Sequence, residues 1–272
     1  SSTVAPLSEA AAELFQEENS GVRVTVGTSG TGGGFEKFCN GETDISDASR
    51  AIEADEAAAC QAKGIAYQEL VVGLDGLSVV VSKDNDWAKC LTIPQLNKIW
   101  GADSVIQNWK DVDASFPDVA LTLFGPGTDS GTFDYFTAAV NGKEGVSRTD
   151  YNATEDDNVT VNGVTGTKGG LGYLGLSYVQ QNQGKVKGVS VDGGAGCIAP
   201  TTATVQNGSY KPLGRPLYIY VKADALDRPA VTEFVNFYIS NGSEIAKQAL
   251  FVPMTAEQQQ AAQTKIDALK GS

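Results

Sequence analysis

The apolar residues of the chain follow two alternating periods. Residues 4–19 carry apolar side chains at helical spacing, and residues 22–26 alternate β-branched and polar side chains as a half-buried strand does. By the same criteria, strands are expected at 44–48, 66–72, 77–82, 119–124, 169–176, 185–191 and 217–221, and helices from residue 35 and at 54–63, 92–100, 132–140, 229–240, 243–250 and 255–270. Strands that alternate with helices predict an α/β fold with mostly parallel sheets.

The pattern of apolar and polar positions changes near residue 85, and the earlier pattern returns near residue 213. We therefore expect lobe 1 to be built from 1–83 plus 214–272 and lobe 2 from 84–213, with two crossing segments as a hinge and a ligand cleft between the lobes. The longest apolar runs, 77–81 and 217–221, have the length of strands and fall far short of the roughly 20 residues of a membrane helix. The chain is therefore expected to be soluble and globular.

The charge and composition exclude several classes of function. The net charge is −13, and the chain contains no histidine. An acidic chain without basic runs is unsuited to nucleic acid or to an anionic membrane. The absence of histidine removes Ser–His–Asp and Cys–His catalysis and histidine metal sites. No metal or cofactor is expected.

Four cysteines indicate the redox compartment. Cys39, Cys60, Cys90 and Cys197 lack the CxxC spacing of zinc sites and thioredoxin-type motifs. An even number of cysteines in an acidic chain rich in Gly, Thr and Ser favours two disulfides and an oxidising compartment. Buried free thiols in a cytosolic protein are the alternative.

Two glycine-rich turns, 27–35 and 125–133, each connect an expected strand to an expected helix. A helix N-terminus offers unpaired N–H groups and a partial positive charge, while glycine lets a ligand approach the backbone. Neither turn fits GxGxxG closely, and neither has the lysine of a P-loop. The turns therefore favour capture of a small anion, with plain tight turns as the alternative.

Two further segments could contribute to the same site. Residues 1–4 precede the first helix, and Ser49 and Arg50 follow the strand at 44–48. Arginine suits a tetrahedral oxyanion because its planar fork donates two parallel hydrogen bonds. Each segment alone is better explained as a helix cap or a surface residue. Because ligands of open α/β sheets bind outside the carboxyl ends of strands, all four segments are expected to converge in the cleft.

Six stretches carry a family resemblance, namely 1–4, 30–35, 44–50, 125–136, 170–173 and 212–218. In these stretches and in their order, the chain resembles the periplasmic phosphate-binding proteins of ABC-type phosphate importers. The resemblance implies a type II periplasmic-binding-protein (Venus-flytrap) fold that binds inorganic phosphate between two lobes and delivers it to the membrane subunits of the importer. It also implies a monomeric, non-enzymatic protein of the periplasm or the cell exterior, with a lipid-anchored precursor left open.

The resemblance also implies the residues of the site. The positions that match the family's phosphate ligands are Ser2, Thr3, Val4, Thr31 (or Ser29), Gly32, Ser49, Arg50, Asp129, Ser130, Gly131 and Thr132. One branch of the family has an arginine where this chain has Pro126, and an aspartate at the end of the strand where this chain has Ser49 and Arg50. We therefore expect Arg50 to supply the guanidinium and Asp129 the carboxylate. The strand that precedes residues 1–4 in the family is not part of this sequence, so the first sheet is expected to lack it.

A carboxylate beside a bound anion has a chemical explanation. Phosphate at neutral pH keeps a proton that it can donate to Asp129, whereas sulfate has none and would leave a buried charge unpaired. Such a contact distinguishes two anions of similar size. The alternative is that Asp129 only caps its helix. A receptor for sulfate, molybdate or tungstate and a secreted phosphatase on the same scaffold also remain as alternatives.

Within this two-lobe arrangement, the cysteines are expected to pair inside each lobe. Cys39–Cys60 would join neighbouring helices of lobe 1, and Cys90–Cys197 would lie in lobe 2. Both pairings leave the hinge free to move.

Overall fold

The computed structural model describes residues 1–270 and divides into two compact units. Unit 1 is formed by Ser1–Asp75 and the C-terminal segment from Arg215, and unit 2 by Gly76–Gly214. The chain leaves unit 1 along β2 (Tyr67–Ser82) and returns along β10 (Gly214–Lys222). The lobe boundaries expected from the sequence, and a cleft between the lobes, stay predictions.

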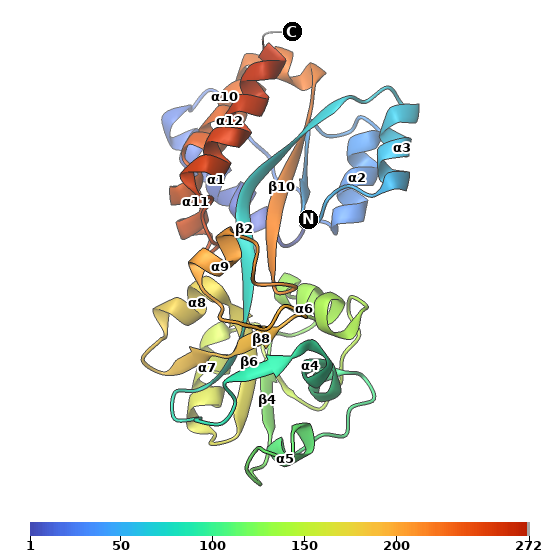
Figure 1. Ribbon diagram of the computed structural model, residues 1–272. Coiled ribbons are helices and arrows are strands. Elements are labelled where there is room, and N and C mark those ends of the chain that lie inside the picture. Colours follow the sequence, from blue (N-terminus) through green and yellow to red (C-terminus); the bar gives the residue numbers. More distant parts are fainter. Residues whose placement is uncertain (271–272) are drawn as a thin grey trace. The chain divides into compact units, whose positions relative to one another are not determined.

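In unit 1, two groups of helices flank a small sheet. Strand β1 (Ile45–Ala48) pairs antiparallel with β10, and β2 follows β10 in the strand order. Helices α2 and α3 lie on one side of β2 and β10, and α10 and α12 lie on the other (Figure 1). The helices of this unit are α1 (Ala5–Glu18), α2 (Thr31–Cys39), α3 (Ala54–Ala62), α10 (Pro229–Ser240), α11 (Gly242–Gln248) and α12 (Ala256–Lys270), with a short 3₁₀ helix at Asp224–Asp227.

Aromatic packing joins α2 to the sheet of unit 1. The buried ring of Phe35 meets Tyr220 edge-on with a centroid separation of 4.8 Å, and Tyr67 meets Tyr220 at 5.5 Å. Edge-to-face pairs of this kind add stabilisation beyond the area they bury. Phe38, Cys39 and Cys60 complete the same cluster, so the buried face of α2 is held against β1 and β10.

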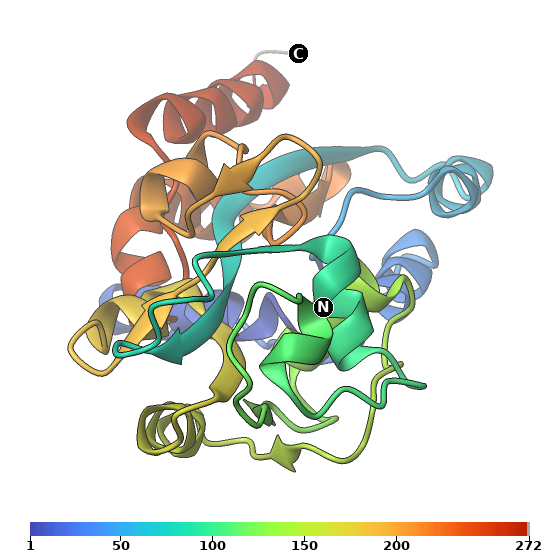
Figure 2. The same ribbon diagram turned by 60° about the horizontal axis from the view of Figure 1, so that its bottom comes forward.

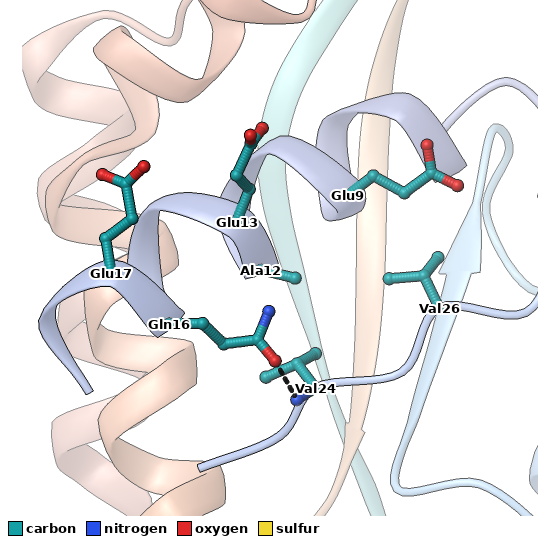
Figure 3. Close-up of a pocket in the computed structure, with 7 residues that line it drawn as sticks. All are labelled: Glu9, Ala12, Glu13, Gln16, Glu17, Val24 and Val26. Atoms are coloured by element: carbon teal, nitrogen blue, oxygen red, sulfur yellow. Dashed lines mark hydrogen bonds between the residues drawn. The ribbon is translucent and has the colours of Figure 1, made fainter. Parts of the chain in front are cut away.

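The strand predicted at 22–26 is not formed. These residues lie outside helices and strands, although their side chains still alternate between half-buried and exposed. A strand needs a neighbour to complete its ladder, and no strand pairs with this segment among residues 1–270. Instead, the side-chain oxygen of Gln16 accepts the Val24 N–H at 2.9 Å (Figure 3). The pattern was that of a strand, but the pairing partner is lacking.

The strands predicted at 66–72 and 77–82 form one continuous strand, β2. The glycines between them do not make a turn. A Cβ at Gly73 would lie 3.1 Å from Leu7, and one at Gly76 would lie 2.8 Å from Val205. Both glycines therefore mark places where another element packs closely against the strand.

In unit 2, β6 lies between the end of β2 and β4. It pairs antiparallel with β2 and parallel with β4, and β4 pairs parallel with β5. The strands of this unit are β3 (Cys90–Thr92), β4 (Thr122–Gly125), β5 (Asn152–Ala153), β6 (Gly170–Gly175), β7 (Val186–Gly188), β8 (Ser190–Asp192) and β9 (Cys197–Ile198). Its helices are α4 (Ile93–Trp100), α5 (Trp109–Val112), α6 (Gly131–Asn141), α7 (Asp157–Gly166), α8 (Leu176–Gln181) and α9 (Thr202–Gln206). The core stacks Phe136 on Tyr173 at 3.8 Å, with Trp100 edge-on to Tyr173 at 5.0 Å.

The expectation of mostly parallel sheets is wrong. Pairings β1–β10, β2–β6, β2–β7 and β8–β9 are antiparallel, whereas β4–β5, β4–β6 and β3–β8 are parallel. Neighbouring strands are parallel when a crossover, usually a helix, brings the chain back to the end of the sheet at which the first strand began. The long strand β2 instead pairs antiparallel with β6 and β7. Local sequence patterns do not reveal the relative direction of strands that are distant in the chain.

Both disulfides are present and each lies within one unit, in agreement with the expected pairing. Cys39 is bonded to Cys60 in unit 1, and Cys90 to Cys197 in unit 2. None of the helices within residues 1–270 has the length and apolar character that crossing a membrane requires.

Candidate anion-binding residues in the two units

The N-terminus of α2 brings two predicted residues into direct contact. Thr31 is the first residue of α2, and no side chain caps the helix at Gly30. The Thr31 hydroxyl lies 3.1 Å from the Ser49 hydroxyl and accepts the Ser49 N–H at 3.2 Å. Ser49 follows directly after β1, so the carboxyl end of this strand and the start of the helix share a pair of neutral hydroxyls.

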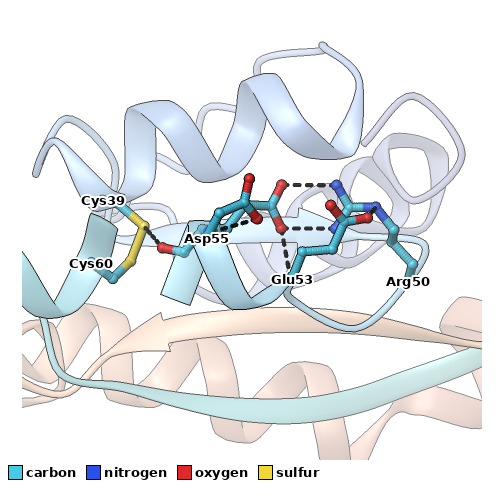
Figure 4. Close-up of a disulfide and its surroundings, with 6 residues drawn as sticks. Cys39, Arg50, Glu53, Asp55 and Cys60 are labelled. Atoms are coloured by element: carbon cyan, nitrogen blue, oxygen red, sulfur yellow. Dashed lines mark hydrogen bonds and ion pairs between the residues drawn. A yellow bond between two sulfur atoms is a disulfide. The ribbon is translucent and has the colours of Figure 1, made fainter. Parts of the chain in front are cut away.

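Arg50 lies beside the same helix turn, where two carboxylates engage its guanidinium. Its two terminal nitrogens each donate to Glu56 at 2.8 Å, and its Nε lies 3.3 Å from Glu53 (Figure 4). The hydrogen bond from Arg50 holds the pKa of the Glu56 carboxyl below its usual range. A Cβ at Gly32 would lie 3.8 Å from Arg50 Nη2, so the guanidinium packs against the first turn of α2.

Sequence reasoning missed the two glutamates that hold Arg50. Glu53 and Glu56 form the capping box of α3, in which the Glu56 side chain accepts the Glu53 N–H at 2.9 Å. An acidic residue followed three positions later by glutamate at a helix start was the available signal. The Glu56 carboxylate therefore both completes the capping box of α3 and orients the guanidinium of Arg50.

The start of α1 adjoins that of α2. The Thr3 hydroxyl accepts from Arg215 Nη2 at 3.4 Å, and Arg215 in turn pairs with the nearly buried Asp75 at 3.3 Å. Val4 is fully buried, and Ser2 is partly exposed. A Cβ at Gly34 in α2 would lie 3.9 Å from the Ser1 nitrogen. Unit 1 thus gathers all seven of its predicted residues around two neighbouring helix N-termini.

A partly buried carboxylate lies next to this part of unit 1. Asp47, in β1, accepts from the Ser8 hydroxyl at 2.9 Å, and the Ser8 hydroxyl lies 3.1 Å from the Tyr238 hydroxyl. Burial raises the pKa of the Asp47 carboxyl, and the nearby Ser1 amino group partly opposes that shift. Asp47 also lines an open pocket of unit 1 together with Ser1 and Gly34.

In unit 2, four predicted residues occupy consecutive positions at the start of α6. Ser130 is the N-cap, and its hydroxyl accepts the Thr132 N–H at 3.2 Å. Gly131 and Thr132 form the first turn, and Asp129 precedes the cap with an exposed side chain. The alternative in which Asp129 caps the helix is therefore wrong, because Ser130 fills that position.

The loop before Ser130 adjoins the segment that leads from β5 into α7, because the Thr154 N–H donates to the Gly125 carbonyl at 3.0 Å. Figure 2 shows the short strand β5 leading into α7 in yellow-green. Strands β4 and β5 are parallel, with Gly125 opposite Ala153. The Tyr151 hydroxyl donates to the Pro126 carbonyl at 2.7 Å, and burial, with Glu155 nearby, raises the pKa of that phenol. The starts of α6 and α7 therefore lie at the carboxyl ends of neighbouring parallel strands, where α/β sheets commonly bind ligands.

Arg148 does not take part in this edge of unit 2. Its side chain is buried and donates to Asp150 at 2.6 and 2.8 Å and to the carbonyls of Ile99 and Ile106 at 3.0 and 2.9 Å. Arg148 therefore links the segments that carry Ile99, Ile106 and Asp150. Within residues 1–270, no cluster of three or more Cys, Asp or Glu side chains could hold a metal ion.

Comparison with known proteins agrees with the family resemblance found in the sequence. Residues 1–242 match the PBP superfamily domain. The chain is 48% identical to Protein SphX of Synechococcus elongatus over 260 residues, covering 94% of this chain and 77% of that protein. It is 39% identical to Phosphate-binding protein PstS of Staphylococcus epidermidis over 254 residues, covering 93% and 76%.

Two solved structures extend the likeness to the fold. A possible phosphate binding protein from Planctomyces limnophilus is 44% identical and superposes with a TM-score of 0.93, covering 99% of this chain and 96% of that one. A putative phosphate ABC transporter substrate-binding protein from Clostridium perfringens, solved with bound phosphate, is 26% identical with a TM-score of 0.64, covering 94% and 97%.

Proposed function

We propose that this chain, which belongs to the phosphate-binding proteins of the PBP superfamily, captures inorganic phosphate and delivers it to the membrane subunits of an ABC importer. The family membership rests on the matched domain and on the identity to curated relatives. The observation that best supports phosphate as ligand is the pair of helix N-termini furnished with neutral hydroxyls, at Thr31 with Ser49 and at Ser130 with Thr132. Such termini suit a small oxyanion.

In this proposal, two lobes close on the ligand, lobe 1 being 1–83 plus 214–272 and lobe 2 being 84–213. The ligand set comprises Ser2, Thr3, Val4, Thr31, Gly32, Ser49, Arg50, Asp129, Ser130, Gly131 and Thr132. Most of these groups are uncharged donors, and Arg50 already shares its charge with Glu53 and Glu56. Binding would therefore rest on preorganised hydrogen bonds rather than on excess positive charge.

The same proposal places the protein in the periplasm or at the cell exterior. It takes the protein to be a monomer and leaves open a lipid-anchored precursor. Two intrachain disulfides support an oxidising compartment. The acidic net charge of −13 supports a partner other than nucleic acid.

Two alternatives are separable from this proposal. A receptor for sulfate, molybdate or tungstate would use the same kind of neutral donors. A phosphatase would need Ser130 or Thr31 as nucleophile together with a base, and the chain has no histidine to serve as one. Turnover of p-nitrophenyl phosphate that depends on Ser130 would favour the enzyme.

The direct test is isothermal titration of the ligand-stripped protein with phosphate and, separately, with sulfate and molybdate. We expect phosphate to bind tightly, and Thr31→Val and Ser130→Ala each to weaken its binding about tenfold or more, since each removes one hydrogen bond to a charged ligand. Ser243→Ala, at an exposed position in α11, serves as a control and should leave binding unchanged. No heat with phosphate, together with tight binding of another oxyanion, would refute the choice of ligand.

A further inference from the structure

The start of α6 is surrounded by further carboxylates besides Asp129: Asp134 lies in the first turn of the helix, and Glu155 approaches from the end of β5. Glu155 lies two residues beyond the last paired residue of β5, and Gly127 lies two residues beyond the last paired residue of β4. The backbone stays paired toward this point, since the Thr154 N–H donates to the Gly125 carbonyl at 3.0 Å. The side chain of Glu155 therefore meets the loop of α6 by strand register.

The Glu155 side chain packs closely against Gly127 in this loop. A Cβ at Gly127 would lie 2.0 Å from Glu155 Oε1 and 3.0 Å from its Cδ. The Gly127 carbonyl in turn accepts the N–H of Ser130, the N-cap of α6, at 3.2 Å. The carboxylate is thus packed on the turn that carries the cap.

The two carboxylates next to Glu155 in sequence lie at the start of α7. Asp156 is the N-cap of α7, and its carboxylate accepts the Asn158 N–H at 2.9 Å. Asp157 is partly buried in the first turn of α7, where burial, with Asp156 and Glu155 nearby, raises the pKa of its carboxyl. Of the three, only Glu155 is packed against the α6 turn by the contacts described above.

We propose that Glu155, rather than Asp129, is the residue that selects a protonated oxyanion at the start of α6. This assignment rests on the proposed function. An unprotonated anion such as sulfate would face the Glu155 carboxylate without a hydrogen to share, and the two negative charges would repel. Hydrogen phosphate can donate its proton to that carboxylate and form a charge-assisted hydrogen bond. Discrimination then comes from the unfavourable contact with the wrong anion as well as from the favourable one with phosphate.

The test compares Glu155→Gln with Asp129→Asn by isothermal titration with sodium phosphate and sodium sulfate at pH 7. Both changes keep the size of the side chain and remove one negative charge. We expect Glu155→Gln to weaken phosphate binding about tenfold and to strengthen sulfate binding about tenfold, which lowers the phosphate-to-sulfate affinity ratio about a hundredfold. Asp129→Asn, at a residue of the proposed ligand set, should change that ratio less than Glu155→Gln does. Glu144→Gln, which neutralises an exposed carboxylate beyond α6, is the control and should leave the ratio within about threefold of the wild-type value.

The outcomes separate this assignment from the proposed function. If the wild-type protein binds phosphate but Glu155→Gln leaves the ratio unchanged, the assignment fails and the function stands. If Asp129→Asn lowers the ratio instead, the selecting carboxylate is Asp129. If the wild-type protein binds no phosphate, both fail. Thermal unfolding of both variants without ligand shows whether the fold is retained, and a lowered ratio in Glu155→Gln at the wild-type Tm supports the assignment.

Discussion

Replacing Gly127 by alanine probes the contact with Glu155 through stability as well as through binding. The new Cβ would lie 2.0 Å from Glu155 Oε1, and ordinary contact begins at 3.4 Å, so the carboxylate must retreat by about 1.4 Å. Glu155 is exposed, and its side chain has staggered alternatives of similar energy. Alanine also lowers the entropy of the unfolded chain, which stabilises the native state by about 0.4–1 kcal/mol. We expect a free energy of unfolding within about 1 kcal/mol of wild type.

Gly169→Ala is the matched control, because its clash has the same size but meets backbone. Its Cβ would lie 1.9 Å from the carbonyl oxygen of Ala120. The peptide of Ala120 is held by a bridge to Asn108, and the Gly169 carbonyl accepts the Trp109 indole N–H at 3.0 Å. Neither backbone segment can rotate away, so the two segments must move apart. Overpacking of this kind costs about 1–3 kcal/mol.

Urea unfolding of both ligand-free variants at pH 7 measures the difference. Gly127→Ala should unfold near the wild-type midpoint and Gly169→Ala at a clearly lower urea concentration. In titrations, Gly127→Ala should also lower the phosphate-to-sulfate affinity ratio, because it displaces the carboxylate that Glu155→Gln neutralises. Equal destabilisation of the two variants would refute the reasoning, since it would show that Glu155 is fixed in place as firmly as backbone.

Three further predictions concern the framework around the site. Glu56→Gln should lower the free energy of unfolding by about 1 kcal/mol at pH 7, because it weakens both the Arg50 pair and the cap of α3. Since the folded-state pKa of Glu56 is lowered, this contribution is present above its unfolded pKa and is lost as pH falls through the folded pKa. The urea midpoints of variant and wild type should therefore converge in acid, and a constant gap between them would contradict the assignment. Removing the Cys90–Cys197 disulfide by a double alanine substitution should cost about 4–5 kcal/mol, because the sequence separation is 107; a loss below about 1 kcal/mol in chemical denaturation would mean that the unfolded loop is already restrained. Tyr220→Phe should lower stability by about 1–3 kcal/mol, because the lost hydroxyl donates to one carboxylate and accepts one backbone N–H; an unchanged Tm would show that water replaces it.

Local chemistry was readable from the sequence where it depends on neighbours in the chain. The glycine-rich turns at 27–35 and 125–133 both lead into helices, and the hydroxyls at Thr31 and Ser130 stand at the starts of those helices. The proximity of Ser49 to Thr31 was also expected, because β1 and the turn after it return to the start of α2, the helix that they follow in the sequence. These features follow from propensity, capping and short loops.

Features that depend on distant pairing were not readable. The direction of β2 against β6 depends on how the chain returns, and the lone segment at 22–26 shows that a strand pattern does not ensure a partner. The contact of Glu155 with Gly127 requires the parallel register of β4 and β5. An acidic residue and a glycine at equal distances past two parallel strands would have been the signal, but it becomes visible only once those strands are aligned.

The charges around the proposed ligands lead to a last prediction, on ionic strength. The guanidinium of Arg50 is matched by Glu53 and Glu56, and that of Arg215 by Asp75. The chain as a whole carries −13, so long-range attraction for an anion is absent, and binding must come from short hydrogen bonds that salt screens little. The dissociation constant for phosphate should therefore change less than about threefold between 0.05 and 0.5 M sodium chloride in isothermal titration. A weakening of more than about tenfold would show that a cation, Arg50 first among them, leaves its carboxylates to meet the ligand and that the paired arrangement belongs to the unliganded protein alone.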